Sequence, residues 1–262
     1  MKERLDRRVL GAIRWIDAVT LAPIAHPLKV SSNALRFTRN LSGLSVVTLA
    51  DGLTAHTQTF DLNSLAPADQ VPTESLSREG EVEDPTGTYL PTRFTLLLPR
   101  NPSPDFLPPD VNHPEPYRPD NSLFLPVDVS LLPSPTARVA SGFAEVRIQI
   151  SNPAGEPIRN ALARVVSATD ANDVLGYGLS DPRGETLVAI PKLKHFAPGA
   201  TEAEVVSVVT DGRIEIVLPP AGQDIVDWTT LLTAPAAADG IDSVVLKLKP
   251  SGRYSRRYPF TT

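Results

Sequence analysis

The chain has 262 residues, with 27 prolines, 15 glycines, no cysteine and a formal net charge of −5. Proline at about one residue in ten excludes a long helical bundle and favours short β-strands, because the ring nitrogen cannot donate to a helix or to a central strand. The lack of cysteine excludes disulfides and cysteine-ligated metal sites, and the acidic balance argues against nucleic acid as a partner.

The N-terminal residues lack the pattern of a secretion signal. Residues 1–8 are basic, but Arg14, Asp17, Pro23 and Pro27 interrupt the next stretch of chain before an apolar core of sufficient length is reached. No stretch approaches the roughly 18 apolar residues that would span a bilayer. We therefore expect synthesis in the cytoplasm without a signal peptide, and no membrane insertion.

Residues 9–98 are predicted to form a first β-sandwich domain. Within it, residues 61–84 hold seven acidic side chains and one basic side chain. Residues 247–257, by contrast, hold five basic side chains and no acidic one. Two interpretations stay open: both segments are solvated surfaces, as charge runs usually are, or they are complementary and join subunits head to tail.

Residues 99–136 are predicted to be a proline-rich strap between two β-rich halves. Eight of the 21 residues from 99 to 119 are proline, and such runs favour an extended, semi-rigid conformation. The strap also contains large apolar side chains, which a solvated linker does not need. We therefore expect Phe106, Leu107 and Tyr117 to dock on a partner.

Residues 137–249 are predicted to form a second β-sandwich domain. Alternating apolar residues predict strands at 139–150, with a bulge near Glu145, and at 162–168, 174–179 and 185–190. The β-branched runs 204–210 and 213–218 flank Asp211-Gly212, a dipeptide typical of a two-residue hairpin turn.

The remaining elements of this half are shorter. The spacing of Ile225, Trp228 and Leu232 predicts one short helix at 224–232. Residues 243–249 are predicted to be a strand that points Val244 inward and its lysines outward. Residues 250–262 are expected to be a basic aromatic tail, removable without loss of the fold.

Two motifs of the second half carry a family resemblance. Gly155-Glu-Pro157 and Asp181-Pro-Arg-Gly184 place turns between strands, Ala161 is small enough to pack under a facing sheet, and Asp181 can cap its own turn. Residues 137–220 thereby resemble the transthyretin-like, carboxypeptidase-regulatory type of β-sandwich. A fainter repeat of the pattern covers residues 9–50. The resemblance implies a mainly β, two-sandwich fold and an accessory, adhesive or assembly role.

The sequence contains no catalytic or metal-binding constellation. The four histidines, His26, His56, His113 and His195, are scattered without metal-ligand spacing, and no cluster of tyrosine with histidine suggests an iron site. The Asp170-Ala-Asn-Asp173 stretch is better interpreted as an acidic turn than as a calcium loop, since Leu175 stands where glycine is required. We expect no enzyme activity, no metal and no cofactor.

Two functions remain. The first is a non-enzymatic structural subunit, a homo-oligomer in a larger particle; the stretch at 82–100 resembles subunits of contractile phage-tail-like injection particles in cap, adaptor or baseplate positions. The alternative is a carbohydrate- or surface-binding module that stacks sugars on Trp15, Trp228, Tyr177 and the tail tyrosines. The residues expected to bind partners are Phe106, Leu107, Tyr117, Lys247, Lys249, Arg253, Tyr254, Arg256, Arg257 and Tyr258.

Overall fold

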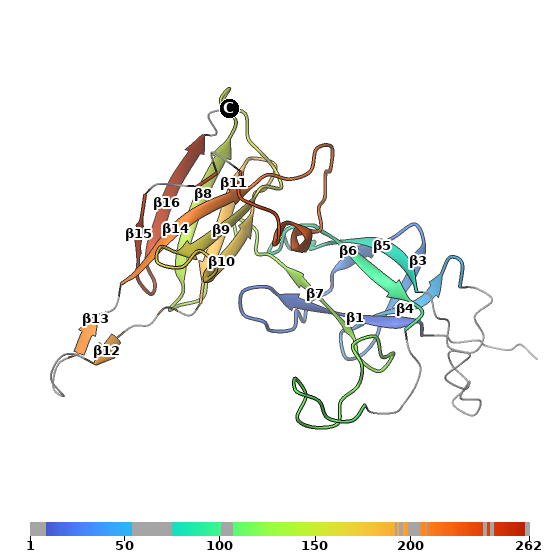
Figure 1. The fold of residues 1–262 in the computed structure, drawn as a ribbon. Coiled ribbons are helices and arrows are strands. Elements are labelled where there is room, and N and C mark those ends of the chain that lie inside the picture. Colours follow the sequence, from blue (N-terminus) through green and yellow to red (C-terminus); the bar gives the residue numbers. More distant parts are fainter. Residues whose placement is uncertain are drawn as a thin grey trace, which may run out of the picture. The chain divides into compact units, whose positions relative to one another are not determined.

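The structure is a computed structural model that describes residues 9–53, 75–100, 107–191, 193, 196–198, 205–207, 209–237, 240–241 and 244–259 (Figure 1). This part of the chain is mainly β and forms several sheets, with no helix of seven or more residues. None of its helices is long and apolar enough to cross a membrane.

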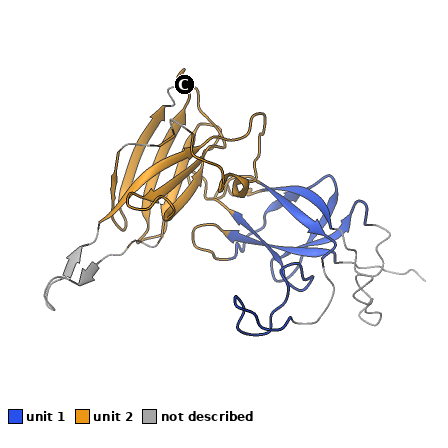
Figure 2. Ribbon diagram, viewed as in Figure 1, with its two compact units in different colours: residues 1–16, 23–82, 93–130 blue, residues 17–22, 83–92, 131–262 orange. Residues whose placement is uncertain are grey.

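The chain divides into two compact units, and neither is continuous in sequence (Figure 2). Unit 1 comprises residues 1–16, 23–82 and 93–130, and unit 2 comprises residues 17–22, 83–92 and 131–262. The predicted boundaries at 98 and 137 do not match this division. The proline-rich segment belongs with unit 1, because the strands on both sides of it join sheets of that unit. Of the predicted strap, residues 99–130 fall in unit 1 and residues 131–136 in unit 2, and its role as a strap stays a prediction.

Unit 1 contains two sheets. The first has the order β3-β4-β1-β7 and the second has the order β2-β5-β6. The strands are β1 (Gly11–Asp17), β2 (Lys29–Ser31), β3 (Leu35–Arg39), β4 (Ser45–Ala50), β5 (Leu76–Glu83), β6 (Thr92–Leu98) and β7 (Val127–Leu131). The Arg14 guanidinium on β1 donates two 2.7 Å bonds to the Asp128 carboxylate on β7.

Two aromatic side chains, Trp15 and Phe94, pack together in the largely aliphatic core of unit 1. The Trp15 ring packs edge-on against Phe94, with 5.4 Å between ring centroids. The indole Nε1 donates to Ser45 Oγ at 2.9 Å, so the buried polar atom of Trp15 is satisfied. Gly80 lies under the Phe94 ring, where a Cβ atom would come within 2.5 Å of Cζ. A glycine is required at this point because the backbone of β5 approaches the ring so closely.

Unit 2 is a sandwich of two main sheets. One has the order β10-β9-β14-β15, the other has the order β11-β8-β16, and β12 pairs separately with β13. The strands are β8 (Ala144–Ser151), β9 (Leu162–Ser167), β10 (Val174–Leu179), β11 (Glu185–Ile190), β12 (Phe196–Pro198), β13 (Val205–Ser207), β14 (Thr210–Val217), β15 (Leu246–Leu248) and β16 (Arg253–Pro259).

The core of unit 2 lies between these sheets. Alternate residues of β8 point inward, and they pack with apolar residues of β9, β11, β14 and β15. A second buried cluster surrounds Trp228, which is 5% exposed, and includes Leu90, Leu162 and Leu179. Leu90 comes from the 83–92 segment, which explains why that segment belongs to unit 2.

The turn chemistry of the second half is confirmed. Gly155 and Gly184 have φ values of +82° and +72°, which glycine adopts without the strain that a Cβ atom would cause. Asp181 Oδ1 accepts hydrogen bonds from the backbone N–H groups of Arg183 and Glu185 and so caps its own turn. Ala161 is fully buried.

Strands β9, β10 and β11 confirm the predictions at 162–168, 174–179 and 185–190, whereas β8 has no bulge at Glu145. The predicted hairpin at Asp211-Gly212 is wrong. Both residues lie inside β14, which pairs with β15 on one side and β9 on the other. Paired strands on both sides outweigh the local turn preference.

The ends of unit 2 also differ from expectation. The helix predicted at 224–232 is a single 3-10 turn, η2 (Trp228–Leu231), capped by the Asp227 side chain. The strand predicted at 243–249 is limited to β15, and Val244 is exposed rather than inward. Of the residues expected to be a tail, Arg253–Pro259 form β16, which pairs in parallel with β8 over its whole length, and residues 260–262 lie outside the described residues.

Candidate functional site

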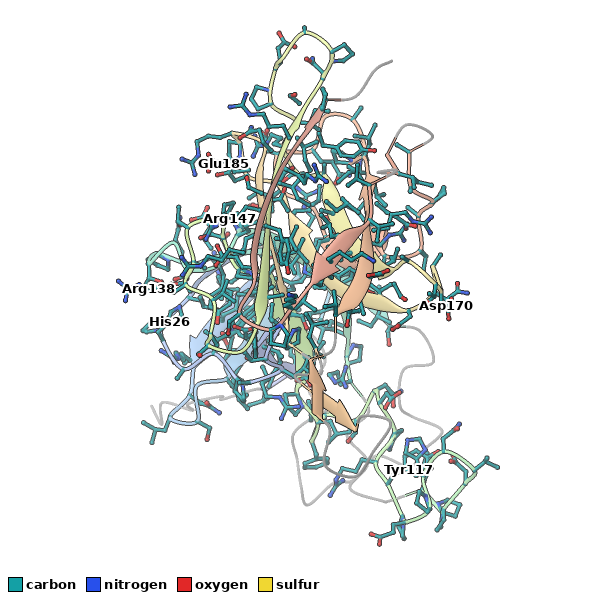
Figure 3. All side chains as sticks on the ribbon, turned by 90° about the vertical axis from the view of Figure 1, so that its left-hand side faces the viewer. His26, Tyr117, Arg138, Arg147, Asp170 and Glu185 are labelled. Carbon is teal, nitrogen blue, oxygen red and sulfur yellow. The ribbon has the colours of Figure 1, made fainter. Side chains whose placement is uncertain are left out.

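The described residues hold no group of three or more His, Asp or Glu side chains that could bind a metal. His26 and His113 lie in separate segments, and His56 and His195 fall outside the described residues. The turn at Asp170 is closed by its own carboxylate, which accepts from Asn172 N at 2.9 Å. It lies on the flank of unit 2 opposite Arg147 (Figure 3).

Strand β16 gives the predicted basic aromatic residues two different roles. Its sequence alternates, so Tyr254 and Tyr258 face the core while Arg253 and Arg257 are exposed. The two tyrosines pack against the apolar cluster between the sheets. Their rings are half-buried, and Arg256 shares this face; the partner-binding role of Tyr254, Arg256 and Tyr258 stays a prediction.

The Tyr254 hydroxyl closes the neighbouring sheet edge. It accepts from the backbone N–H of Lys249 at 2.8 Å and donates to the carbonyl of Lys247 at 2.7 Å. These are backbone groups of β15 and its flank, at the edge of the four-stranded sheet. A side chain thus satisfies two backbone groups on the outer side of β15, where a further strand would otherwise pair.

The edge of β16 is different. It is the outermost strand of its sheet, and the Gly252 carbonyl accepts from Glu145 N, so even-numbered residues direct their backbone groups to β8. Because these directions alternate along a strand, Arg253, Ser255 and Arg257 direct their N–H groups to the free side. Pro259 has no N–H and ends this row. Such an edge can accept another extended chain.

A cationic cleft adjoins the start of β16. Its volume is about 490 Å³, and it is lined by Arg138, Arg147, Arg253 and Glu145 together with residues 136, 137 and 139. Arg138 and Arg147 lie along one flank of unit 2, on the same side as Glu185 (Figure 3). With three guanidinium groups against one carboxylate, the cleft has an excess of positive charge.

Glu145 organises the cleft. The Arg147 side chain donates to the Glu145 carboxylate and also to the Pro135 carbonyl, which fixes its guanidinium over the sheet. Arg253 Nε lies 3.6 Å from the second Glu145 oxygen, and its side chain remains 85% exposed. Arg138 is exposed as well. Arg138 and Arg253 therefore retain N–H donors for a ligand, since each guanidinium offers five.

Of the two predicted lysines, Lys247 lies on β15 and Lys249 follows it. Lys247 Nζ lies 2.7 Å from Asp211 Oδ2, an exposed pair within the same sheet. Lys249 is exposed next to the edge that Tyr254 closes. A charge already paired across its own sheet contributes little to recognition of a partner.

In the proline-rich loop, the predicted residues Leu107 and Tyr117 make contacts within the loop itself. Leu107 and Tyr117 exchange two backbone hydrogen bonds that close the loop, and Phe106 falls outside the described residues. The Tyr117 hydroxyl donates to Asp110 Oδ2 at 2.7 Å, and the Tyr117 ring stacks on His113 at 3.8 Å. This bond, with further donors from residues 112 and 113, lowers the pKa of the Asp110 carboxyl to about 2.

The base of this loop is anchored as well. Arg100, which is 8% exposed, donates to the carbonyls of Asp120 and Ser122. Burial lowers the pKa of its guanidinium. Val111 and Leu107 remain exposed on the loop. The loop is therefore held in shape by its own hydrogen bonds and by Arg100.

The aromatic residues that a carbohydrate-binding module would use to stack sugars are largely buried. Trp15 and Trp228 are 4% and 5% exposed, and Tyr177 packs against the Trp228 cluster. A polar groove of about 540 Å³ lies between β2 and β5 of unit 1, but its lining contains no aromatic side chain. Both arginines of its lining have internal partners, since Arg78 donates to the Asp51 carbonyl and Arg93 to Glu81.

The acidic segment is described only from residue 75. There, Asp84 is used within its own turn, where it accepts from the backbone N–H groups of Thr86, Thr88 and Tyr89. Glu81 is paired with Arg93 at 2.9 Å. The acidic side chains at residues 61, 69 and 74, which head-to-tail joining would also use, lie outside the described residues.

No family model and no curated protein matches this sequence. Among solved structures, the TIE protein of Bacillus anthracis has a TM-score of 0.26 and 9% identity, over 96% of this chain and 34% of that one. The major pilin SpaA of Corynebacterium diphtheriae has a TM-score of 0.21 and 14% identity, over 89% of this chain and 55% of that one. This chain thus spans about a third and about half of their lengths, and at these scores the likeness assigns no function.

Proposed function

We propose that the protein is a non-enzymatic structural subunit that assembles into a larger particle through the β16 side of unit 2. One observation carries this proposal: among the described residues β16 is an outermost strand with no strand on its outer side, and it has exposed arginines and an adjoining cationic cleft. A monomer that had no partner would more often protect such an edge, as Tyr254 does for β15.

The proposal also specifies the kind of particle. We place the protein in a cap, adaptor or baseplate position of a contractile phage-tail-like particle, in agreement with the sequence resemblance at residues 82–100. The preformed loop at 107–117 supports an assembly role, because a rigid projection loses little conformational entropy when a partner binds it.

Light scattering on the purified chain, alone and mixed with tube and sheath proteins of contractile particles, tests both parts. We expect association, and we expect Arg257→Glu to weaken it by about tenfold through repulsion at the edge. Arg36→Glu is the matched control, because Arg36 is an exposed arginine on β3, an outermost strand of unit 1. A strict monomer that binds none of these proteins would overturn the proposal.

A further inference from the structure

We infer that the partner segment bound by β16 is an extended acidic peptide, which adds to the sheet as a fourth strand and places a carboxylate in the Arg138–Arg253 cleft. This inference rests on the proposed function and names the chemistry of its partner. It combines two neighbouring features, the backbone edge and the cleft, that share Arg253.

The backbone edge selects an extended polypeptide. The N–H groups of Arg253, Ser255 and Arg257 form a row at the spacing of a strand, and only another extended backbone supplies carbonyl groups at that spacing. Nucleic acids offer phosphates but no such ladder.

The side chains select acidic residues. Arg253 and Arg257 are exposed along the same strand, and residues directly across from them on an added strand would lie close enough to pair. A carboxylate opposite Arg253 would also reach the cleft, where Arg138 is exposed. Hydrogen bonds between guanidinium and carboxylate are among the strongest that such a site can form.

The same charges disfavour pairing of β16 with a second copy of itself. Two antiparallel copies related by a twofold axis at Ser255 would place Arg253 of each copy opposite Arg257 of the other. Like charges directly opposite each other destabilise a strand pair. Dimerisation through this edge is therefore opposed, and an acidic segment of different sequence is favoured.

Binding of a fluorescent ten-residue peptide, with glutamate alternating with threonine, tests the inference by anisotropy on the full chain. We expect Arg138→Gln and Arg253→Gln each to weaken binding by about tenfold, since each removes a charged hydrogen bond. Arg36→Gln is the matched control and should leave binding unchanged. A peptide with lysine in place of glutamate should not bind.

The strand-addition step has its own variants. Ser255→Pro removes one outward N–H while keeping every charge, and a peptide with alternate N-methylated amides removes the complementary donors. Both should abolish binding of the acidic peptide, with circular dichroism confirming that unit 2 remains folded. If both changes are harmless, or if inorganic polyphosphate displaces the peptide and binds equally well to Ser255→Pro, the edge is only an anion patch and the inference is overturned.

The two proposals can fail separately. A chain that associates with particle proteins but ignores the acidic peptide would overturn this inference and leave the proposed function intact. A chain that binds the peptide with the expected dependence on Arg138 and Ser255, but joins no particle protein, would overturn the assignment to a contractile particle. Unchanged peptide affinity in the Arg138→Gln and Arg253→Gln variants would remove the role of the cleft.

Discussion

Gly184→Ala should destabilise unit 2 much more than Gly155→Ala, although both glycines have positive φ. At Gly155 a Cβ atom would meet nothing within 4 Å, so only the backbone conformation is strained. At Gly184 the Cβ atom would lie 2.2 Å from the Ile150 carbonyl oxygen. That carbonyl belongs to β8, which is held by β11 on one side and β16 on the other and cannot easily move away.

The magnitudes follow from these two situations. A non-glycine residue in the left-handed region costs about 1–2 kcal/mol, which is the whole expected effect of Gly155→Ala. Overpacking against a fixed neighbour adds about 1–3 kcal/mol, so Gly184→Ala should cost about 2–5 kcal/mol. For a protein of this size these losses correspond to decreases in Tm of roughly 2–8 °C and 4–20 °C respectively.

Urea unfolding followed by tryptophan fluorescence measures the difference. Trp228 lies in unit 2 and Trp15 in unit 1, so both glycine variants are made in a Trp15→Phe background that leaves Trp228 as the reporter. The effect of the background cancels between them. Equal losses of unfolding free energy in the two variants would refute the reasoning, because they would show that the close approach to β8 has no energetic consequence.

Three further predictions concern other parts of the molecule. Truncation after Pro250 removes β16 and should abolish cooperative unfolding of unit 2 in urea; an unchanged midpoint would show that β16 is dispensable. Ser45→Ala leaves the buried Trp15 indole N–H without its partner and should cost about 1–3 kcal/mol in unit 1, measured by Trp15 fluorescence, whereas no loss would contradict that bond. Because the folded pKa of Asp110 is depressed to about 2, its stabilisation of the 107–117 loop should be full above pH about 4 and lost as the pH falls through about 2. An NMR titration of the Tyr117 ring checks this, and loss of loop order near pH 4 would contradict it.

Local chemistry made the turns and several strands predictable from the sequence. Gly155, Gly184 and Asp181 act through short-range effects, the positive φ of glycine and the capping of a turn by its own carboxylate. The strands β9 to β11 follow from alternating apolar residues between such turns. These signals do not depend on distant parts of the chain, and so the sequence reveals them.

Tertiary contacts explain the errors. Gly212 looks like a turn residue, but it lies within a sheet, where a Cβ atom would come 2.6 Å from Leu248 Cδ1 on the paired strand β15. Gly212 is not one of the glycines with a positive φ, so no turn conformation requires it. A close approach between two strands favours glycine just as a turn does. Only knowledge of the partner strand could have separated these two explanations.

Part of the candidate site was identifiable from its sequence pattern. Residues 253–258 alternate between exposed and half-buried positions, and two of the three half-buried residues are tyrosines; this is the period of a strand, but the high content of basic residues favoured the prediction of a tail. The cleft was not predictable, because Arg138, Arg147 and Arg253 come from three segments that only the pairing of β16 with β8 brings together.

The interleaving of the two units limits how this chain can be rearranged by recombination. Residues 17–22 and 83–92 of unit 2 are encoded inside the stretch that specifies unit 1, so no single crossover point transfers either unit intact. A gene fragment that begins at residue 131 would lack Leu90, which belongs to the buried cluster around Trp228. The two units are therefore expected to be inherited together, and a fusion or deletion made at one boundary would damage both.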